Sequence, residues 1–154
     1  MRGCSRVRKL VLDTGVIVEY IILKSKYRPK IVELFNLASE NKIELYTSIV
    51  ALSEVLYIAS RIYQAANVDD PNDEAKCFIE WIKRRVKVVD VNEDIVLEAG
   101  ELKKQLHIAL PDCYIIATAK YIKAVPVFRK IEREMEPVLT KLREIGVLFL
   151  EGYV

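Results

Sequence analysis

The feature that most constrains this chain is the alternation of short apolar segments with longer amphipathic ones along its whole length. The short segments contain many β-branched residues and are predicted to be buried strands, at residues 7–12, 43–46, 86–89, 124–128 and 146–150. Segments with helical patterning separate them. Strands that alternate with helices form βαβ units, so the sequence predicts an α/β fold with a mostly parallel sheet covered on both faces.

Capping residues and prolines set the expected limits of the helices. Thr47 or Ser48 is expected to cap a long helix that runs to about residue 64, and Asn92 to cap a later one. Leu110–Pro111 interrupts the pattern, because the residue before a proline avoids helical geometry, so the next helix is expected to begin at Asp112. Further helices are expected over residues 15–23, 30–41, 74–84, 112–122 and 131–143, the last with a break at Pro137, and residues 67–73 are expected to form a loop.

Length and composition favour one ordinary domain spanning residues 1–154. The chain has 154 residues, of which 52% are hydrophobic and 30% charged, so it can bury a sizeable core and is not a disordered tail. Its 24 Lys and Arg residues against 22 Asp and Glu residues give a net charge of +2, which by itself does not indicate a nucleic-acid partner. No segment is long and apolar enough to cross a membrane, so we expect a soluble, cytoplasmic protein.

The cysteines and the single histidine exclude several kinds of site. Cys4, Cys77 and Cys113 are odd in number and far apart, so neither a disulfide framework nor a zinc site is indicated. A catalytic triad would have to use His107, and no nucleophile motif accompanies it. His107 is therefore interpreted as a surface residue before a turn. The chain also has neither a P-loop nor a G-x-G-x-x-G motif, which disfavours a nucleotide-binding module.

Three carboxylates stand among apolar residues, where a surface acid is unexpected. Asp13 directly follows the first predicted strand, Glu54 lies in a predicted helix with only apolar neighbours one turn away, and Asp112 opens an apolar helix. Buried carboxylates are costly unless they are paired, protonated or bound to a metal. Sites in such folds lie beyond the carboxyl ends of the strands, so we expect the three to converge there. Without His or Cys, such a cluster suits a hard cation such as Mg²⁺ or Mn²⁺.

Each of these acids also has a purely structural interpretation. Asp13 or Asp112 could cap the helix that follows it. Glu54 could pair with a distant arginine or lie at an apolar subunit interface. The joint placement of the three at the same edge of the predicted sheet is what favours a functional site.

The chain resembles the PIN domain family, which includes the toxin subunits of VapBC-type toxin–antitoxin pairs. Three segments carry the resemblance, in the same order and with the same spacing as in the family: VLDTGVIVEYI, with Asp13; YTSIVALSEVLY, with Glu54; and ELKKQLHIALPDCYIIATAKY, with Asp112. The resemblance implies a three-layer fold with a central parallel sheet of four or five strands. It also implies metal-dependent hydrolysis of RNA, with Mg²⁺ or Mn²⁺ held by Asp13, Glu54 and Asp112.

The resemblance also implies partners. An antitoxin protein would accompany a toxin, and PIN-like proteins commonly form homodimers. The predicted helices over residues 30–41 and 48–64 contain more apolar residues than one face of a sheet needs, which agrees with a homodimer.

The family's fourth acid has no clear counterpart here. The family usually has an Asp just after the strand predicted at residues 124–128, whereas this chain continues with Arg129, Lys130, Ile131 and Glu132. Glu132 is the candidate for that fourth catalytic position, and its alternative is a surface residue in a charged helix. Arg129, Lys130 and Arg133 are candidates for contacts with an RNA backbone, or for a solvated helix face. The missing Asp supports the second functional hypothesis, a non-catalytic PIN-like module that binds RNA or protein.

Overall fold

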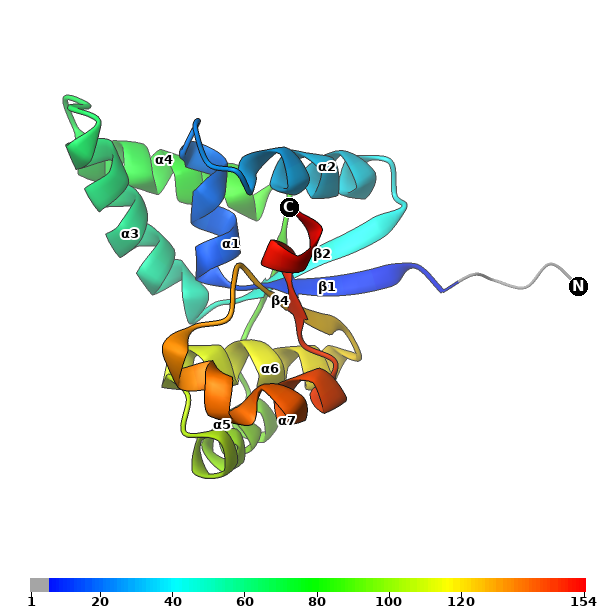
Figure 1. Cartoon of the computed structure of the whole chain (residues 1–154). Coiled ribbons are helices and arrows are strands. Elements are labelled where there is room, and N and C mark those ends of the chain that lie inside the picture. Colours follow the sequence, from blue (N-terminus) through cyan, green and yellow to red (C-terminus); the bar gives the residue numbers. More distant parts are fainter. Residues whose placement is uncertain (1–5) are drawn as a thin grey trace, which may run out of the picture.

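A parallel five-stranded sheet lies at the centre of the computed structural model, which describes residues 6–154 (Figure 1). The strand order is β3-β2-β1-β4-β5, and every neighbouring pair is parallel. This confirms the predicted α/β class. The strands are β1 Arg8–Leu12, β2 Ile43–Ser48, β3 Lys87–Val89, β4 Val125–Phe128 and β5 Leu148–Phe149.

Helices cover both faces of this sheet and make three layers (Figure 1). One layer contains α1 Thr14–Val18, α2 Arg28–Ser39, α3 Ala51–Ala65 and α4 Pro71–Lys83, and the other contains α5 Glu93–Leu106, α6 Leu110–Ile122 and α7 Leu139–Ile145. The described residues also form three short 3₁₀ helices: η1 Glu19–Ile21, η2 Arg133–Val138 and η3 Leu150–Tyr153.

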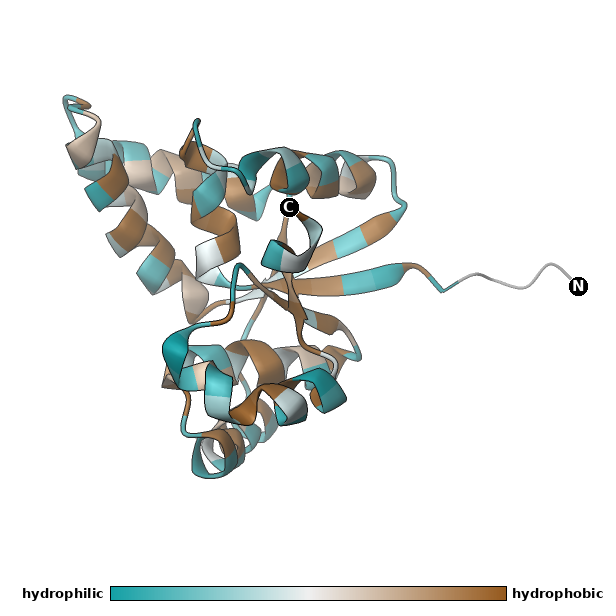
Figure 2. Cartoon of the chain, in the orientation of Figure 1, coloured by the Kyte–Doolittle hydropathy of each residue, from teal (hydrophilic) through white to brown (hydrophobic). Residues whose placement is uncertain are grey.

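The central strand β1 supplies side chains to both hydrophobic cores. Leu10 and Leu12 are buried in the core under α1–α4, whereas Val11 between them is buried in the core under α5–α7. Successive side chains of a strand point to opposite faces, so a continuous apolar run fits a sheet that is covered on both sides. Figure 2 shows the matching pattern on the helices, which carry both hydrophobic and hydrophilic residues.

Thr47 and Ser48 do not cap α3, as the sequence predicted, because they are the last two residues of β2. The hydroxyl of Thr47 instead donates a 2.7 Å hydrogen bond to the carbonyl oxygen of Leu12 at the end of β1. The helix begins at Ala51, and the residue before it, Val50, makes no side-chain capping bond. Thr47 thus joins the ends of β1 and β2, whereas the hydroxyl of Ser48 accepts a 3.3 Å hydrogen bond from the amide of Val50.

Prolines lie inside the first turns of three helices, α2, α4 and α6, and each of these begins earlier than the sequence predicted. Helix α4 begins at Pro71 rather than at residue 74, and α6 begins at Leu110 rather than at Asp112. A proline is tolerated in the first turn because its missing N–H would have no partner there. Pro137 does separate two elements, as predicted, but the segment before it is the 3₁₀ helix η2 rather than an α-helix.

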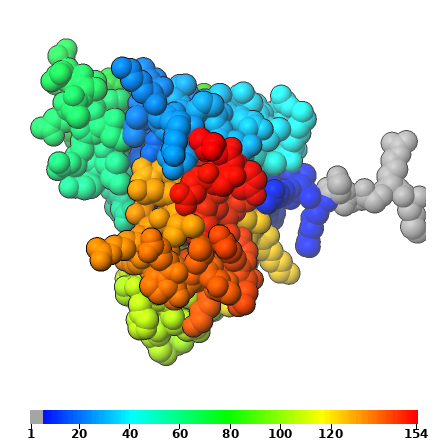
Figure 3. Space-filling view, in the orientation of Figure 1, coloured from blue at the N-terminus to red at the C-terminus, as the bar shows by residue number. Residues whose placement is uncertain are grey.

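The C-terminal residues lie on the surface between the two helical layers (Figure 3). The amide of Glu151 donates to the carbonyl oxygen of Arg129, and its carboxylate accepts from the amide of Ile131, at 3.0 and 2.8 Å. These bonds hold the loop that follows β4. Within residues 6–154, none of the helices is long and apolar enough to span a membrane.

Candidate functional site

Asp13 lies at the carboxyl end of β1 and is the N-cap of α1. Its amide donates to the carbonyl oxygen of Val127 in β4, and its Oδ2 accepts a 3.1 Å hydrogen bond from the amide of Gly15. A Cβ at position 15 would lie 3.2 Å from that Oδ2, so a glycine allows this close approach. The capping role considered for Asp13 is therefore confirmed.

Burial is the largest reason that the pKa of Asp13 rises from 3.8 to about 6. Hydrogen bonds from the amides of Gly15 and Thr14 oppose the rise, the charge of Glu54 adds to it, and the guanidinium of Arg129 lowers the pKa. These effects place a carboxylate and a cation beside Asp13, although neither is near it in the sequence.

Glu54 lies half-buried in the first turn of α3. The hydroxyl of the buried Thr14 donates a 3.4 Å hydrogen bond to the carbonyl oxygen of Ala51, at the start of the same helix. This contact holds the beginnings of α1 and α3 together. The charge of Glu54 raises the pKa of both Asp13 and Asp112.

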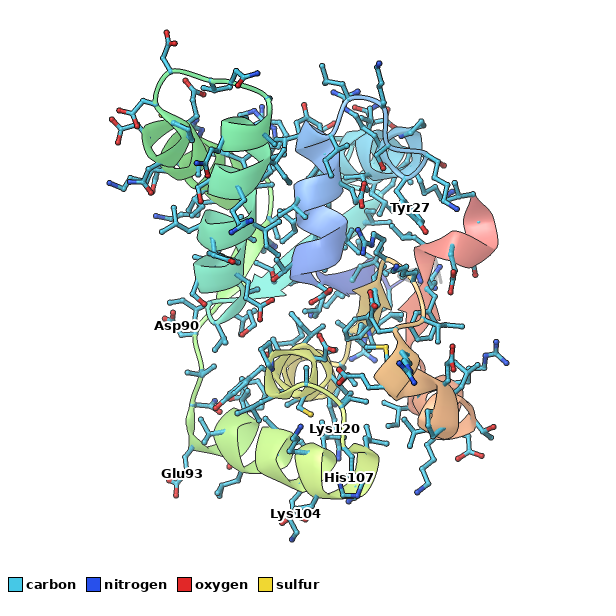
Figure 4. All side chains as sticks on the ribbon, turned by 60° about the vertical axis from the view of Figure 1, so that its left-hand side comes forward. Tyr27, Asp90, Glu93, Lys104, His107 and Lys120 are labelled. Carbon is cyan, nitrogen blue, oxygen red and sulfur yellow. The ribbon has the colours of Figure 1, made fainter. Side chains whose placement is uncertain are left out.

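Asp112 lies in the first turn of α6, where Ala109 rather than Asp112 is the N-cap. The capping role considered for Asp112 is therefore wrong. Its pKa rises from 3.8 to about 8, mainly because it is buried and then because of the charges of Asp13, Glu134, Glu54 and Glu132, in that order. Figure 4 shows α6 nearly end-on, with the beginnings of α1 and α3 on one side of it. The structure thus brings the charges of the three sequence-predicted acids within reach of one another.

Glu132 lies just before η2. Its side chain is more exposed to solvent than those of Asp13, Glu54 and Asp112. Its side chain is 49% exposed, and its Oε1 lies 3.7 Å from Nη2 of Arg129. Its charge is the last in order of those that raise the pKa of Asp112. Glu132 is therefore near the three acids but faces the guanidinium of Arg129.

Sequence reasoning missed Glu134, whose charge affects Asp112 more than that of Glu132. Its Oε1 accepts a 2.9 Å hydrogen bond from the amide of Ala109, and so holds the start of α6. Glu134 stands in a run of charged residues, and nothing in that run distinguishes it from its neighbours.

Sequence reasoning also missed the ion pair between Glu19 and Arg129. Glu19 is only 5% exposed, and its Oε1 lies 2.6 Å from Nη1 of Arg129. The only signal was that Glu19 interrupts an apolar segment. Arg129 follows β4, where the fourth acid was expected, so the structure has a cation near that place.

The donor set has the chemistry of a hard-cation site but is not a complete ligand set as placed. Asp13, Glu54 and Asp112 offer only carboxylate oxygens, the ligands that Mg²⁺ and Mn²⁺ prefer. Among residues 6–154, no three Asp, Glu, His or Cys side chains are grouped closely enough to hold a metal ion. His107 lies exposed at the C-cap of α5, as predicted (Figure 4). Cys4 lies outside the described residues.

Comparison with known proteins agrees with this architecture. The profile of the PIN domain family matches residues 10–129. The crystal structure of DNA-bound VapBC from Salmonella typhimurium is 21% identical, with a TM-score of 0.65, and covers 93% of this chain and 97% of that chain. VapBC2 from Rickettsia felis, bound to a DNA fragment from their promoter, is 18% identical, with a TM-score of 0.64 and coverage of 92% and 96%. PAE2754 from Pyrobaculum aerophilum is 15% identical, with a TM-score of 0.63 and coverage of 99% and 90%. No curated protein matches the sequence.

Proposed function

Because this chain belongs to the PIN domain family, we propose that it is a divalent-metal-dependent ribonuclease, and that Asp13, Glu54 and Asp112 are its metal-binding carboxylates. The observation that carries this proposal is the mutual influence of three acids from three separate elements. The charge of Glu54 raises the pKa of Asp13, and the charges of Asp13 and Glu54 raise the pKa of Asp112, in each case in addition to burial. An arrangement that keeps like charges together without a bound cation costs stability, which is typical of a functional site.

The chain's own residues position the carboxylates before any ligand arrives. The amide of Gly15 orients one oxygen of Asp13, the bond from Thr14 to Ala51 sets α3 and hence Glu54 beside it, and Glu134 holds the start of α6. When bound, Mg²⁺ or Mn²⁺ supplies positive charge that offsets the charge of the phosphate and lowers the pKa of a water molecule. The acids then keep that charge at the carboxyl edge of the sheet, where RNA has access.

Cleavage of RNA by the purified chain tests the proposal directly. A labelled single-stranded RNA should be cleaved with Mg²⁺ or Mn²⁺ and left intact with EDTA. Absence of cleavage under both metal conditions would favour the alternative function, a non-catalytic PIN-like module that binds RNA or protein. The specific observation behind that alternative is the arginine that stands near the place of the fourth acid.

We expect Mn²⁺ to stabilise the folded chain, since it would relieve the repulsion among the acids. A ligand present at about 100 times its Kd stabilises the folded state by about 2.7 kcal/mol. The melting temperature should therefore rise by several degrees, on the order of 2–4 °C for each kcal/mol. The increase should be larger at pH 8 than at pH 6, because protons compete with the metal for Asp112, whose pKa is about 8. Differential scanning fluorimetry in a Mn²⁺ series measures it, and an unchanged melting temperature would contradict the metal site.

The proposed biological role is that of a VapC-like toxin which acts on RNA in the cytoplasm and is controlled by an antitoxin protein. Its support is the fold shared with chains in VapBC crystal structures. A small open reading frame next to this gene should encode the antitoxin. Its product should co-purify with the chain and inhibit RNA cleavage.

We further propose a homodimer and predict that α3 contributes to its interface. The apolar residues Ile31, Leu34 and Phe35 of α2 are buried in the core, so this helix has less apolar surface available than the sequence suggested. On α3, by contrast, Tyr57 is 61% exposed. Light scattering at micromolar concentration should give twice the chain mass, and Tyr57→Asp should shift it toward the monomer. A monomeric mass for the unaltered chain would contradict this prediction.

A further inference from the structure

We propose that Arg129 binds an RNA phosphate beside the acids, held for this purpose by the buried Glu19, with Glu132 as an exchangeable counter-ion. The inference deepens the proposed function and rests on it, because it assigns the substrate contact of the same site. It concerns the segment just after β4, where the PIN family usually has an Asp and this chain has Arg129.

Arg129 stands next to the acids because β4 ends beside β1. The amide of Asp13 donates to the carbonyl oxygen of Val127, and Arg129 follows two residues later. A Cβ at Gly15 would lie 3.2 Å from Oδ2 of Asp13 and 3.6 Å from Cβ of Arg129. The guanidinium also lowers the pKa of Asp13. A phosphate held between the acids and Arg129 would meet positive charge on that side.

Arg129 is held at its side chain and at its backbone. Nη1 pairs with Glu19 at 2.6 Å, and Glu19 is only 5% exposed. The carbonyl oxygen of Arg129 accepts from the amide of Glu151 at 3.0 Å. Nε is buried and donates to no acceptor among residues 6–154. The side chain is thus held by its ion pair with Glu19, while Nε stays without an acceptor in the described part of the chain.

The other side of the guanidinium faces outward. The side chain of Arg129 is 30% exposed, and Nη2 lies 3.7 Å from Oε1 of Glu132, which is itself 49% exposed. At 3.7 Å this is a loose contact with an exposed carboxylate, and such pairs contribute little stability. A phosphate oxygen can replace that carboxylate, since a charge-assisted hydrogen bond from Nη2 to phosphate is shorter and stronger than this loose contact. Glu19 keeps Nη1 throughout, so it acts as a positioning residue.

RNA binding without divalent metal separates this contact from catalysis. The probe is a fluorescein-labelled single-stranded oligoribonucleotide in EDTA, followed by fluorescence anisotropy over a series of salt concentrations. Arg129→Gln should weaken binding about tenfold, as expected for the loss of one charge-assisted hydrogen bond. The slope of log K against log salt should fall by about 0.7, the value for one phosphate contact on a single strand.

Three further variants keep the test independent of folding. The double variant Glu19→Gln/Arg129→Gln leaves no unpaired buried charge and should show the same loss of affinity and slope. Glu19→Gln alone should weaken binding but keep the slope, because the charge of Arg129 remains. Glu132→Gln should strengthen binding a few-fold, because a competing carboxylate is removed. The matched control is Arg85→Gln, which removes the same charge just before the edge strand β3, three strand positions away from β4, and should leave both quantities unchanged.

Equal affinities for the double variant and for Arg85→Gln would overturn the proposal, as would an unaltered chain that does not bind RNA. An unchanged affinity in Glu132→Gln would overturn the role of Glu132 as a competing counter-ion. Failure of the proposed function is distinguishable from these results. A chain that binds RNA through Arg129 but cleaves none would contradict the ribonuclease alone, whereas normal cleavage with unchanged binding by the double variant would contradict the phosphate contact alone.

Discussion

Asp112→Asn is expected to reduce Mg²⁺-dependent RNA cleavage by more than about 100-fold. Substitutions of the groups that merely orient metal ligands typically cost 10–100-fold in activity or metal affinity, so loss of a ligand itself should cost more. Asn keeps the shape of the side chain and loses only the charge that would hold the metal. Initial rates of RNA cleavage at saturating Mg²⁺ measure the effect.

The fold of this variant should remain intact and become more stable without metal. In the folded chain the pKa of Asp112 is about 8, against an ordinary value of 3.8. Its folded state therefore binds the proton more tightly than the unfolded chain does, and its contribution to stability falls as the pH rises from about 4 to about 8. Asp112→Asn lacks this loss, so at pH 8 in EDTA its melting temperature should exceed that of the unaltered chain by at least about 2 °C.

Asp94→Asn is the matched control, because Asp94 also lies in the first turn of a helix, α5, and is exposed there. If Asp112 served only the dipole of α6, both substitutions would have similarly small effects on cleavage. Activity near that of the unaltered chain in Asp112→Asn would therefore exclude Asp112 from the proposed metal site.

The sheet could be predicted from the sequence because its strands are short, nearly fully buried and therefore continuously apolar. Leu10, Val11 and Leu12 of β1 are buried on alternating faces. A continuous apolar run of this length fits few structures other than a strand in a covered parallel sheet. The starts of the helices were harder to predict. Pro71 and Pro111 were interpreted as residues outside helices, although a proline fits the first turn of a helix as well as a loop.

The candidate site was predictable to the extent that its residues contradict their local surroundings. Asp13, Glu54 and Asp112 have no partner one helical turn away, and this is visible in the sequence alone. Glu19 and Arg129 form their pair across 110 positions, and no local pattern reports such a contact. Arg129 follows a strand, and an arginine is common in such a loop, so its identity gives no signal of a functional role. Only the adjacency of β1 and β4 in the sheet brings it to Asp13.

Arg129→Gln is expected to destabilise the fold by about 3 kcal/mol. Removing one partner of a buried ion pair typically costs 3–5 kcal/mol, because the other charge stays buried without compensation. Here that charge is the carboxylate of Glu19, which is 5% exposed. We expect the lower end of the range because Arg129 is 30% exposed and the pair is partly solvated. Urea denaturation followed by circular dichroism measures the change.

Glu19→Gln should cost less, about 1 kcal/mol, since the guanidinium that remains can still interact with water and with the carboxylate of Glu132. The double variant Glu19→Gln/Arg129→Gln should recover much of the stability lost in Arg129→Gln, because no buried charge is left unpaired. If Arg129→Gln unfolded within about 0.5 kcal/mol of the unaltered chain, the predicted contribution of the Glu19–Arg129 pair to stability would be wrong. The cycle thus separates the stability that the ion pair gives the fold from RNA binding by Arg129, and weaker RNA binding in Glu19→Gln with only a small loss of stability is the result expected of a positioning residue.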